Sequence, residues 1–180
     1  MAPIFKKHDR YWGEIAVFGD YLPWNVHRAG GGDRSDYPQN SGRILDLKDG
    51  SAKAAVHFGE IVAKELADNV VIVTVPGHDP AKPSAGLRQL ASELAKGGKR
   101  VDCSDCLVRT TKIDKLAHGG DRAEEVHLKS VIVAKPSDIK GKDVLLIDDV
   151  TKTGHSLVAC KKLLLKAGAG SVQCVTLGKT

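Results

Sequence analysis

Residues 142–156 read KDVLLIDDVTKTGHS, and this stretch decides the fold of the chain. Residues 144–147 are continuously apolar, which is typical of a β-strand that is buried on both faces of a sheet. Two aspartates follow, then a short polar stretch with Gly154, and then a helical pattern that runs through Lys166. A buried strand that leads through a turn into a helix predicts a parallel α/β sheet.

The same pattern recurs on the N-terminal side of this stretch. Residues 51–68 predict a helix with Ala55, Phe58, Val62 and Leu66 on one side, and a second helix covers residues 84–96. Residues 69–75, NVVIVTV, predict another buried strand, which ends at Pro76 and Gly77. Further strands are expected at residues 14–18, 44–47, 100–110, 128–134 and 171–177.

These elements predict an α/β fold with a mostly parallel twisted sheet flanked by helices. Residues 1–180 form one domain in this interpretation, with residues 1–50 as a small irregular hood and residues 51–180 as the core. The hood is expected to be irregular because it holds most of the aromatic rings and a loop-like stretch at residues 28–42.

The composition excludes several classes of protein. Hydrophobic residues make up 42% of the 180 residues, enough for a core, but no run of about eighteen apolar residues could span a membrane. The first residues lack the apolar segment of a secretory signal, and four cysteines are too few for a disulfide scaffold, so we expect a cytoplasmic protein. The net charge of +5 favours acidic ligands, although it is weak support for nucleic acid.

The residues after the central strand predict a binding site, because ligands of parallel sheets bind at the carboxyl ends of the strands. Asp148 and Asp149 could accept hydrogen bonds from ligand hydroxyls or lie near a cation. Residues 151–156 combine small hydroxyl side chains, Gly154 and a helix N-terminus, which suits a phosphate monoester. A ligand that offers a diol to the aspartates and a phosphate to the turn would be a sugar phosphate. The alternative is that the two aspartates form a solvated acidic turn that binds no ligand.

Residues 144–156, VLLIDDVTKTGHS, resemble the phosphoribosyl pyrophosphate (PRPP) motif of the type I phosphoribosyltransferases. The resemblance implies the fold of that family and a site in which Asp148 and Asp149 bind the ribose 2- and 3-hydroxyls. The residues that it assigns to PRPP binding are Asp148, Asp149, Val150, Thr151, Lys152, Thr153, Gly154, His155 and Ser156.

The resemblance extends from about residue 69 to the last strand and implies a second set of residues. Pro76, Gly77 and His78 would form the loop that binds the leaving diphosphate, although any turn can contain Pro-Gly. In similar enzymes a loop at the place of residues 109–125 closes over the site. The cations that could neutralise diphosphate there are Arg109, Lys112, Lys115 and Arg122. The catalytic set is then Asp148, Asp149, Arg109 and Lys112.

The family resemblance also implies a reaction and a cofactor. We expect transfer of the 5-phosphoribosyl group of PRPP to a nitrogenous base or similar acceptor, with release of diphosphate. Mg²⁺ would be held mainly by PRPP and water, with no direct protein ligand. By analogy with the family we expect a homodimer. Trp12, Tyr21 and Trp24 of the hood could line the acceptor pocket, or could pack as a small core or a dimer contact.

Two details bear on the branch of the family. Residues 84–96, SAGLRQLASELAK, and the segment that begins at VRTTK are most similar to the ComF-like branch, which is linked to competence and DNA uptake. Lys152 stands where the 6-oxopurine enzymes have an aspartate, which disfavours hypoxanthine-guanine salvage. The alternative function is a non-catalytic PRPP- or nucleotide-binding protein that acts with a partner or DNA.

The remaining motifs give weaker evidence of function than residues 144–156. Cys103 and Cys106 have the spacing of a metal pair but lack two convincing further ligands, and a strand would put them on opposite faces. A phosphate-binding P-loop motif is absent, and the glycines at 30–32 neither follow a strong strand nor open a helix. A receiver domain is excluded because no acidic residue follows Asp149.

Overall fold

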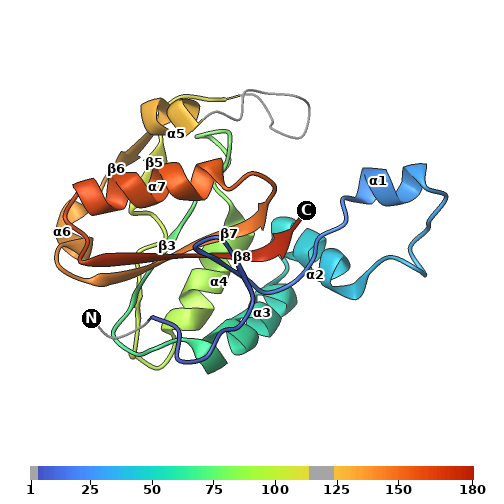
Figure 1. Cartoon of the computed structure of the whole chain (residues 1–180), viewed down its shortest axis with the longest axis horizontal. Helices are drawn as coiled ribbons and strands as arrows, with labels where there is room; N and C mark the ends of the chain where they lie inside the picture. Colours follow the sequence, from blue (N-terminus) through green and yellow to red (C-terminus); the bar gives the residue numbers. More distant parts are fainter. Residues whose placement is uncertain (1–3, 114–123) are drawn as a thin grey trace.

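The computed structural model describes residues 4–113 and 124–180 (Figure 1). Within these residues the main sheet has six strands in the order β1-β2-β8-β7-β3-β4, and β5 and β6 form a separate antiparallel pair. Neighbours in the main sheet are parallel except β1 and β2. The strands are β1 (Tyr11–Trp12), β2 (Ile15–Val17), β3 (Val71–Thr74), β4 (Val101–Asp102), β5 (Leu107–Arg109), β6 (Val131–Val133), β7 (Asp143–Thr151) and β8 (Ser171–Lys179).

The helices cover both faces of this sheet. Figure 1 shows α7 on one side of the sheet and α3 and α4 on the other. The helices are α1 (Trp24–Ala29), α2 (Gln39–Lys48), α3 (Ala52–Glu65), α4 (Ala85–Ala95), α5 (Glu124–Ser130), α6 (Pro136–Ile139) and α7 (His155–Lys166). None of the described helices is long and apolar enough to cross a membrane.

Strand β7 divides the core into two layers. Leu145 and Ile147 pack in the cluster that α2, α3 and α4 cover, whereas Val144 and Leu146 pack in the cluster that α7 covers. All four side chains are fully buried, because successive residues of a strand point to opposite faces and both faces are covered here. This explains why the strand is continuously apolar and has no alternating pattern.

The predicted fold class is confirmed, and so are most of the expected elements. Strands at 14–18, 69–75, 142–150 and 171–177 and helices at 51–68 and 84–96 correspond to β2, β3, β7, β8, α3 and α4. The strand expected at 44–47 is wrong, because these residues lie in α2, where Ile44 and Leu47 are buried at helical spacing. The expected strand at 128–134 begins only at Val131, since α5 occupies the residues before it.

The single strand expected at 100–110 is also wrong. It is interrupted by a turn in which the N–H of Cys106 donates to the carbonyl of Cys103, so that β4 and β5 lie in different sheets. The turn buries both cysteines in the core layer beneath α7 and does not place them on opposite faces. Among residues 4–113 and 124–180 there is no cluster of three or more His, Cys, Asp or Glu side chains that could hold a metal.

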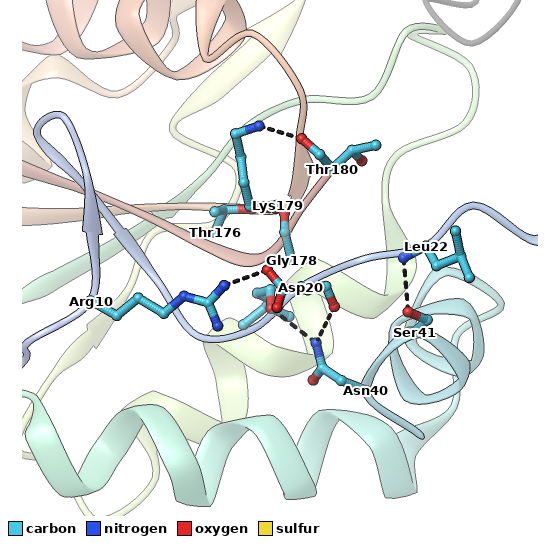
Figure 2. A network of polar contacts seen from close by, with 10 residues as sticks. Arg10, Asp20, Leu22, Asn40, Ser41, Thr176, Gly178, Lys179 and Thr180 are labelled. Carbon is cyan, nitrogen blue, oxygen red and sulfur yellow. Dashed lines mark hydrogen bonds and ion pairs between the residues drawn. The ribbon is translucent and has the colours of Figure 1, made fainter. Parts of the chain in front are cut away.

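The N-terminal segment joins the edge of the main sheet. β2 pairs in parallel with β8, and the pairing continues beyond β2 because Lys179 donates from its N–H to the carbonyl of Gly19. The side-chain amide of Asn40 donates to the carbonyl of Asp20 at 3.0 Å (Figure 2) and to the carbonyl of Leu177 at 3.5 Å. Helix α1 projects away from this body, and none of its residues is buried (Figure 1).

We predict that Gly86→Ala lowers the free energy of unfolding by about 1–3 kcal/mol, the usual cost of overpacking. A Cβ at Gly86 would lie 1.7 Å from the carbonyl oxygen of Leu47, so α4 and the last turn of α2 would have to separate. Urea unfolding measures the change. Ser92→Ala, an exposed position of the same helix, is the control and should change stability by less than about 0.5 kcal/mol. Equal effects of the two variants would contradict the prediction.

Candidate active site

The carboxyl ends of β3, β7 and β8 meet at one edge of the sheet. Residues Val71–Thr74 of β3 pair with Val144–Ile147 of β7, and Asp148 of β7 pairs with Thr176 of β8. The aspartate pair therefore lies between the turn that starts at Pro76 and the end of β8. Ligands of open parallel sheets bind at this edge.

Thr151 and Gly154 shape the turn between β7 and α7. The backbone N–H of Gly154 donates to Oγ1 of the buried Thr151 at 3.0 Å. Gly154 has φ +74°, and a Cβ there would lie 3.0 Å from Cζ3 of Trp12 and 3.1 Å from Cδ1 of Ile15. Glycine is thus required both by the backbone conformation and by the space. Lys152 and Thr153 are exposed at the tip of the turn, just before the N-terminus of the twelve-residue helix α7.

Asp148 is half-buried and is held by its neighbours. Its carboxylate accepts hydrogen bonds from Oγ of Ser156 and from the N–H of Asp149, both at 3.0 Å. Burial, followed by the negative charge of Asp149, raises the pKa of Asp148 above its usual range, while the hydroxyl of Ser156 opposes the shift. Ser156 thus orients a carboxylate in addition to the phosphate-loop position that the sequence predicts for it.

Asp149 pairs with a lysine that sequence analysis missed. The Nζ of Lys48, the last residue of α2, lies 3.6 Å from the Asp149 carboxylate and 4.9 Å from the centre of the Tyr21 ring. Burial raises the pKa of Asp149, and the charge of Lys48 opposes this. No motif marks Lys48 in the sequence, because the pair forms only when α2 packs beside the carboxyl end of β7.

The predicted diphosphate loop follows β3, and the two predicted cations lie differently with respect to it. Pro76, Gly77 and His78 are half-buried. Lys112 is exposed, and its ammonium lies 3.2 Å from the carboxylate of Asp79. Arg109 is buried, with 3% of its surface exposed, and its guanidinium donates to the carbonyl of Gly77. Two further predicted cations, Lys115 and Arg122, lie outside the described residues.

The three aromatic residues expected in the acceptor pocket have different surroundings. Trp12 packs against Gly154, and Nζ of Lys179 lies 4.5 Å from its ring centre. Tyr21 lies beside Gly178, whose added Cβ would be 2.7 Å from that of Tyr21. Trp24 belongs to the projecting helix α1 and contacts the rings of His27 and Tyr37, at 5.7 and 5.0 Å between centroids. Of the three, Trp12 and Tyr21 are next to residues of the predicted PRPP site or of β8.

We predict that Asp148→Asn stabilises the protein at pH 8 by about 1–3 kcal/mol. Raising the pKa of the carboxyl from 3.8 to about 7 corresponds to about 4 kcal/mol, whereas loss of a hydrogen bond to the charged carboxylate costs about 1.5–3 kcal/mol. The pKa of Asp148 is higher in the folded than in the unfolded chain, so the carboxyl lowers stability as pH rises from about 4 through the folded pKa. Asparagine removes this penalty. Thermal unfolding at pH 8 and pH 4 tests it: the gain should be present at pH 8 and lost at pH 4.

Asp9→Asn is the control for that measurement, since Asp9 is exposed. It should leave the unfolding temperature unchanged at both pH values. An Asp148→Asn variant that is destabilised equally at pH 8 and pH 4 would show that the hydrogen bonds of the carboxylate outweigh its charge.

Comparison with known proteins identifies distant relatives with two different names. The chain is 27% identical over 130 residues to the ribose-phosphate pyrophosphokinase of Methanopyrus kandleri, a match that covers 72% of this chain and 37% of that protein. It is also 27% identical over 158 residues to the uracil phosphoribosyltransferase of Bifidobacterium longum, covering 79% of this chain and 72% of that protein. The chain thus spans little more than a third of the first of these relatives.

Solved structures of related proteins give lower identities. A hypoxanthine phosphoribosyltransferase from Staphylococcus aureus matches with a TM-score of 0.42 and 19% identity, over 76% of this chain and 65% of that one. A purine phosphoribosyltransferase from Pyrococcus horikoshii matches with a TM-score of 0.36 and 17% identity, over 91% of this chain and 88% of that one.

A family model decides the assignment. The model of the phosphoribosyl transferase domain matches residues 50–179, which is well over half of the chain and includes β3, β7, the turn at Gly154 and β8. The resemblance seen at residues 144–156 is thereby confirmed at the level of the family. The chain belongs to the phosphoribosyl transferase domain family.

Proposed function

We propose that this protein is a Mg²⁺-dependent phosphoribosyltransferase that transfers the 5-phosphoribosyl group of PRPP to a nitrogenous acceptor. In this reaction the bond from ribose C1 to the diphosphate oxygen breaks, and the electron pair leaves with diphosphate. A nitrogen of the acceptor forms the new bond to C1 and releases its proton to solvent. The observation that carries the proposal is the placement of Asp148 and Asp149 beside the Gly154 turn, at the N-terminus of α7.

The ribose is assigned to the two aspartates of β7, and the 5-phosphate is assigned to the turn that follows them. The carboxylates of Asp148 and Asp149 accept hydrogen bonds from the ribose 2- and 3-hydroxyls, which also offsets the cost of their burial. The backbone N–H groups of residues 151–156 and the positive end of the α7 dipole receive the 5-phosphate. Lys152, exposed at the tip, adds a positive charge.

The side chains at this edge fit Mg²⁺. Asp148 and Asp149 add negative charge near the ion, and because burial raises the pKa of both carboxyls, a nearby cation would stabilise their charged form. The described residues contain no group of three His, Cys, Asp or Glu side chains that could hold a metal, and the ligands of the ion would be mainly oxygens of PRPP and water, with no direct protein ligand. When bound, the ion would neutralise charge on the diphosphate.

Catalysis rests on stabilisation of the leaving group and of the ribosyl cation. The loop Pro76–His78 offers backbone N–H groups to the departing diphosphate, and the exposed Lys112 supplies positive charge beside it. The two aspartates lie on the other side, where their negative charge stabilises a positive centre at C1. We assign no general base.

The acceptor is assigned to residues 1–50, as a hood on the one domain formed by residues 1–180. Tyr21 and Lys48 support this most directly, because Lys48 pairs with Asp149 and its ammonium also lies over the Tyr21 ring. Trp12 and Trp24 remain candidates for stacking on a flat base. A homodimer is a further part of the proposal and rests on analogy with the family, and a cytoplasmic location rests on the small number of cysteines.

A second candidate is a non-catalytic PRPP- or nucleotide-binding protein of the ComF-like branch. Support comes from residues 84–96, which contain α4 and follow the diphosphate loop along the chain, and from the positive net charge, which permits an acidic partner such as DNA. This candidate binds PRPP without cleaving it, so release of diphosphate in the presence of nitrogenous bases separates it from the transferase.

We predict that PRPP binds in the presence of Mg²⁺ and that Asp148→Asn/Asp149→Asn weakens binding at least about 100-fold. Each lost hydrogen bond to a charged group costs about 1.5–3 kcal/mol, and two are lost. Isothermal titration calorimetry measures the affinity. The matched control is Glu60→Gln/Asp9→Asn, which removes two exposed negative charges away from the site and should bind like the wild type. Absence of PRPP binding by the wild type would overturn both candidates.

We also predict that Gly154→Ala lowers the affinity for ribose 5-phosphate about tenfold. The added Cβ would push the turn away from Trp12 and Ile15 and displace the N–H groups that receive the phosphate. Gly141→Ala is the control, because Gly141 has φ +69° but open space around its Cβ position. Both variants should lose about 1–2 kcal/mol of stability, the cost of a left-handed backbone. Equal ribose 5-phosphate affinity in the two variants would contradict the assigned phosphate position.

A further inference from the structure

Arg109 is a buried cation whose hydrogen bonds go to neutral groups. The residue ends β5 and has 3% of its surface exposed. Its guanidinium donates to the carbonyls of Gly77 and Pro76, the latter at 3.3 Å, and to Oγ of Ser130 at 2.5 Å and Nδ1 of His127 at 3.4 Å. One planar group therefore links the diphosphate loop to α5.

The two loop carbonyls belong to consecutive peptide groups, and this fixes the direction of the N–H groups. In a trans peptide the N–H points away from the carbonyl of the same group. With the carbonyls of Pro76 and Gly77 turned toward Arg109, the N–H groups of Gly77 and His78 point away from it. The next carbonyl, that of His78, is also held, because it accepts from the N–H of Ile113 at 3.0 Å.

The N–H groups of Gly77 and His78 are available to a ligand. Among residues 4–113 and 124–180 neither donates a backbone hydrogen bond, whereas the N–H of Val75 just before them donates to Ile147 within the sheet. Successive N–H groups that face one way make a site for an anion. The positive charge of Arg109 behind the same two peptide groups adds to this preference, since a guanidinium stays ionised even when burial lowers its pKa.

The guanidinium is also hydrogen-bonded on the side that faces away from the loop. Oγ of Ser130 accepts from Arg109 and donates to the carbonyl of Val126 at 2.6 Å. The N–H of Thr110 donates to the carbonyl of Ser130 at 2.8 Å, which fixes the strand end that carries Arg109. Arg109 thus connects the loop to α5, and its guanidinium cannot turn toward a ligand without breaking its contacts with α5.

We propose that Arg109 is a positioning residue: it holds the diphosphate loop from behind, so that the N–H groups of Gly77 and His78 face the leaving diphosphate. The identity of that ligand rests on the proposed function, whereas the positioning itself does not. This role differs from the direct contact with diphosphate that the sequence suggests. It also requires arginine, because the planar fork reaches two carbonyls and Ser130 at once, which a lysine ammonium cannot do.

The chain offers a matched control in Arg100. Its side chain is 9% exposed and donates to the carbonyls of Ala67 and Leu66, both at 2.9 Å, and of Ala63 and Leu94, both at 3.3 Å. It precedes β4, at the opposite end of the strands from the site. Arg100 also lies 3.8 Å from the carboxylate of Asp68, and Arg100→Lys removes a similar set of carbonyl contacts without touching the diphosphate loop.

The first test needs no ligand. ¹⁵N relaxation of the free protein gives order parameters for the N–H groups of Gly77 and His78, which we expect near 0.85 in the wild type, as for rigid backbone. In Arg109→Lys they should fall below about 0.6, and in Arg100→Lys they should stay as in the wild type. Unchanged values in Arg109→Lys would overturn the positioning role.

The second test separates the two halves of PRPP. Calorimetry with inorganic diphosphate and Mg²⁺ should show about a tenfold loss of affinity in Arg109→Lys, while ribose 5-phosphate binds as in the wild type. Equal losses for both probes would mean a general structural defect and would overturn the proposal. If the wild type binds neither probe, the proposed function is wrong, and the relaxation data alone decide on Arg109.

Ser130→Ala keeps the test decisive if Arg109→Lys does not fold. This variant removes the acceptor on the far side of the guanidinium and leaves the loop contacts in place. We expect a loss of diphosphate affinity of about threefold, with ribose 5-phosphate unaffected. If a folded Ser130→Ala variant binds diphosphate with unchanged affinity, the positioning role of Arg109 is contradicted.

Discussion

The pairing of β7 with β3 on one side and with β8 on the other is the constraint on which the rest of the structure depends. It aligns the ends of three parallel strands at one edge, so that residues distant in the sequence become neighbours. Because Val144–Ile147 are buried on both faces, a shift of register by one residue would exchange the two core layers. The position of Asp148 and Asp149 is therefore fixed by apolar packing several residues away.

Two charged side chains of opposite sign lie near this edge: the half-buried Asp148 and the buried Arg109. Asp148 supports the charged state of Arg109, and both are held by neutral hydrogen-bond partners, Ser156 for the carboxylate and Ser130 for the guanidinium. Burial disfavours the charge of each group, so holding both charges at this edge costs stability. A ligand with hydroxyls on one side and a diphosphate on the other would offset that cost on both sides. The residues that lower the stability of the free protein would then be the ones that raise its affinity for the ligand.

The parts of the fold that the sequence predicts best are those with a strong local pattern. The apolar run at 144–147, the helices α3 and α4 and the turn at Gly154 have spacing or residue types that few other structures accept. Residues 44–47 were too short a run to distinguish a strand from a helix, and the turn at Cys103 carries no glycine or proline to mark it. Two contacts could not be predicted: the pairing of Lys48 with Asp149 and the hydrogen bonds from Arg109 to the loop carbonyls. Both form only through tertiary packing, and no local pattern of the sequence marks them.

The pairing of β2 with β8 has a consequence for the order of folding. These strands are about as far apart in the sequence as the chain allows: Gln173 at β8 donates to the carbonyl of Glu14 across 159 positions. Closing so long a loop carries a large entropic cost, so contacts of this kind form after local ones. The N-terminal segment can pair only after β8 has been made, and until the two meet β8 has an unpaired edge. While it is unpaired, that edge is a site for edge-to-edge association with other chains.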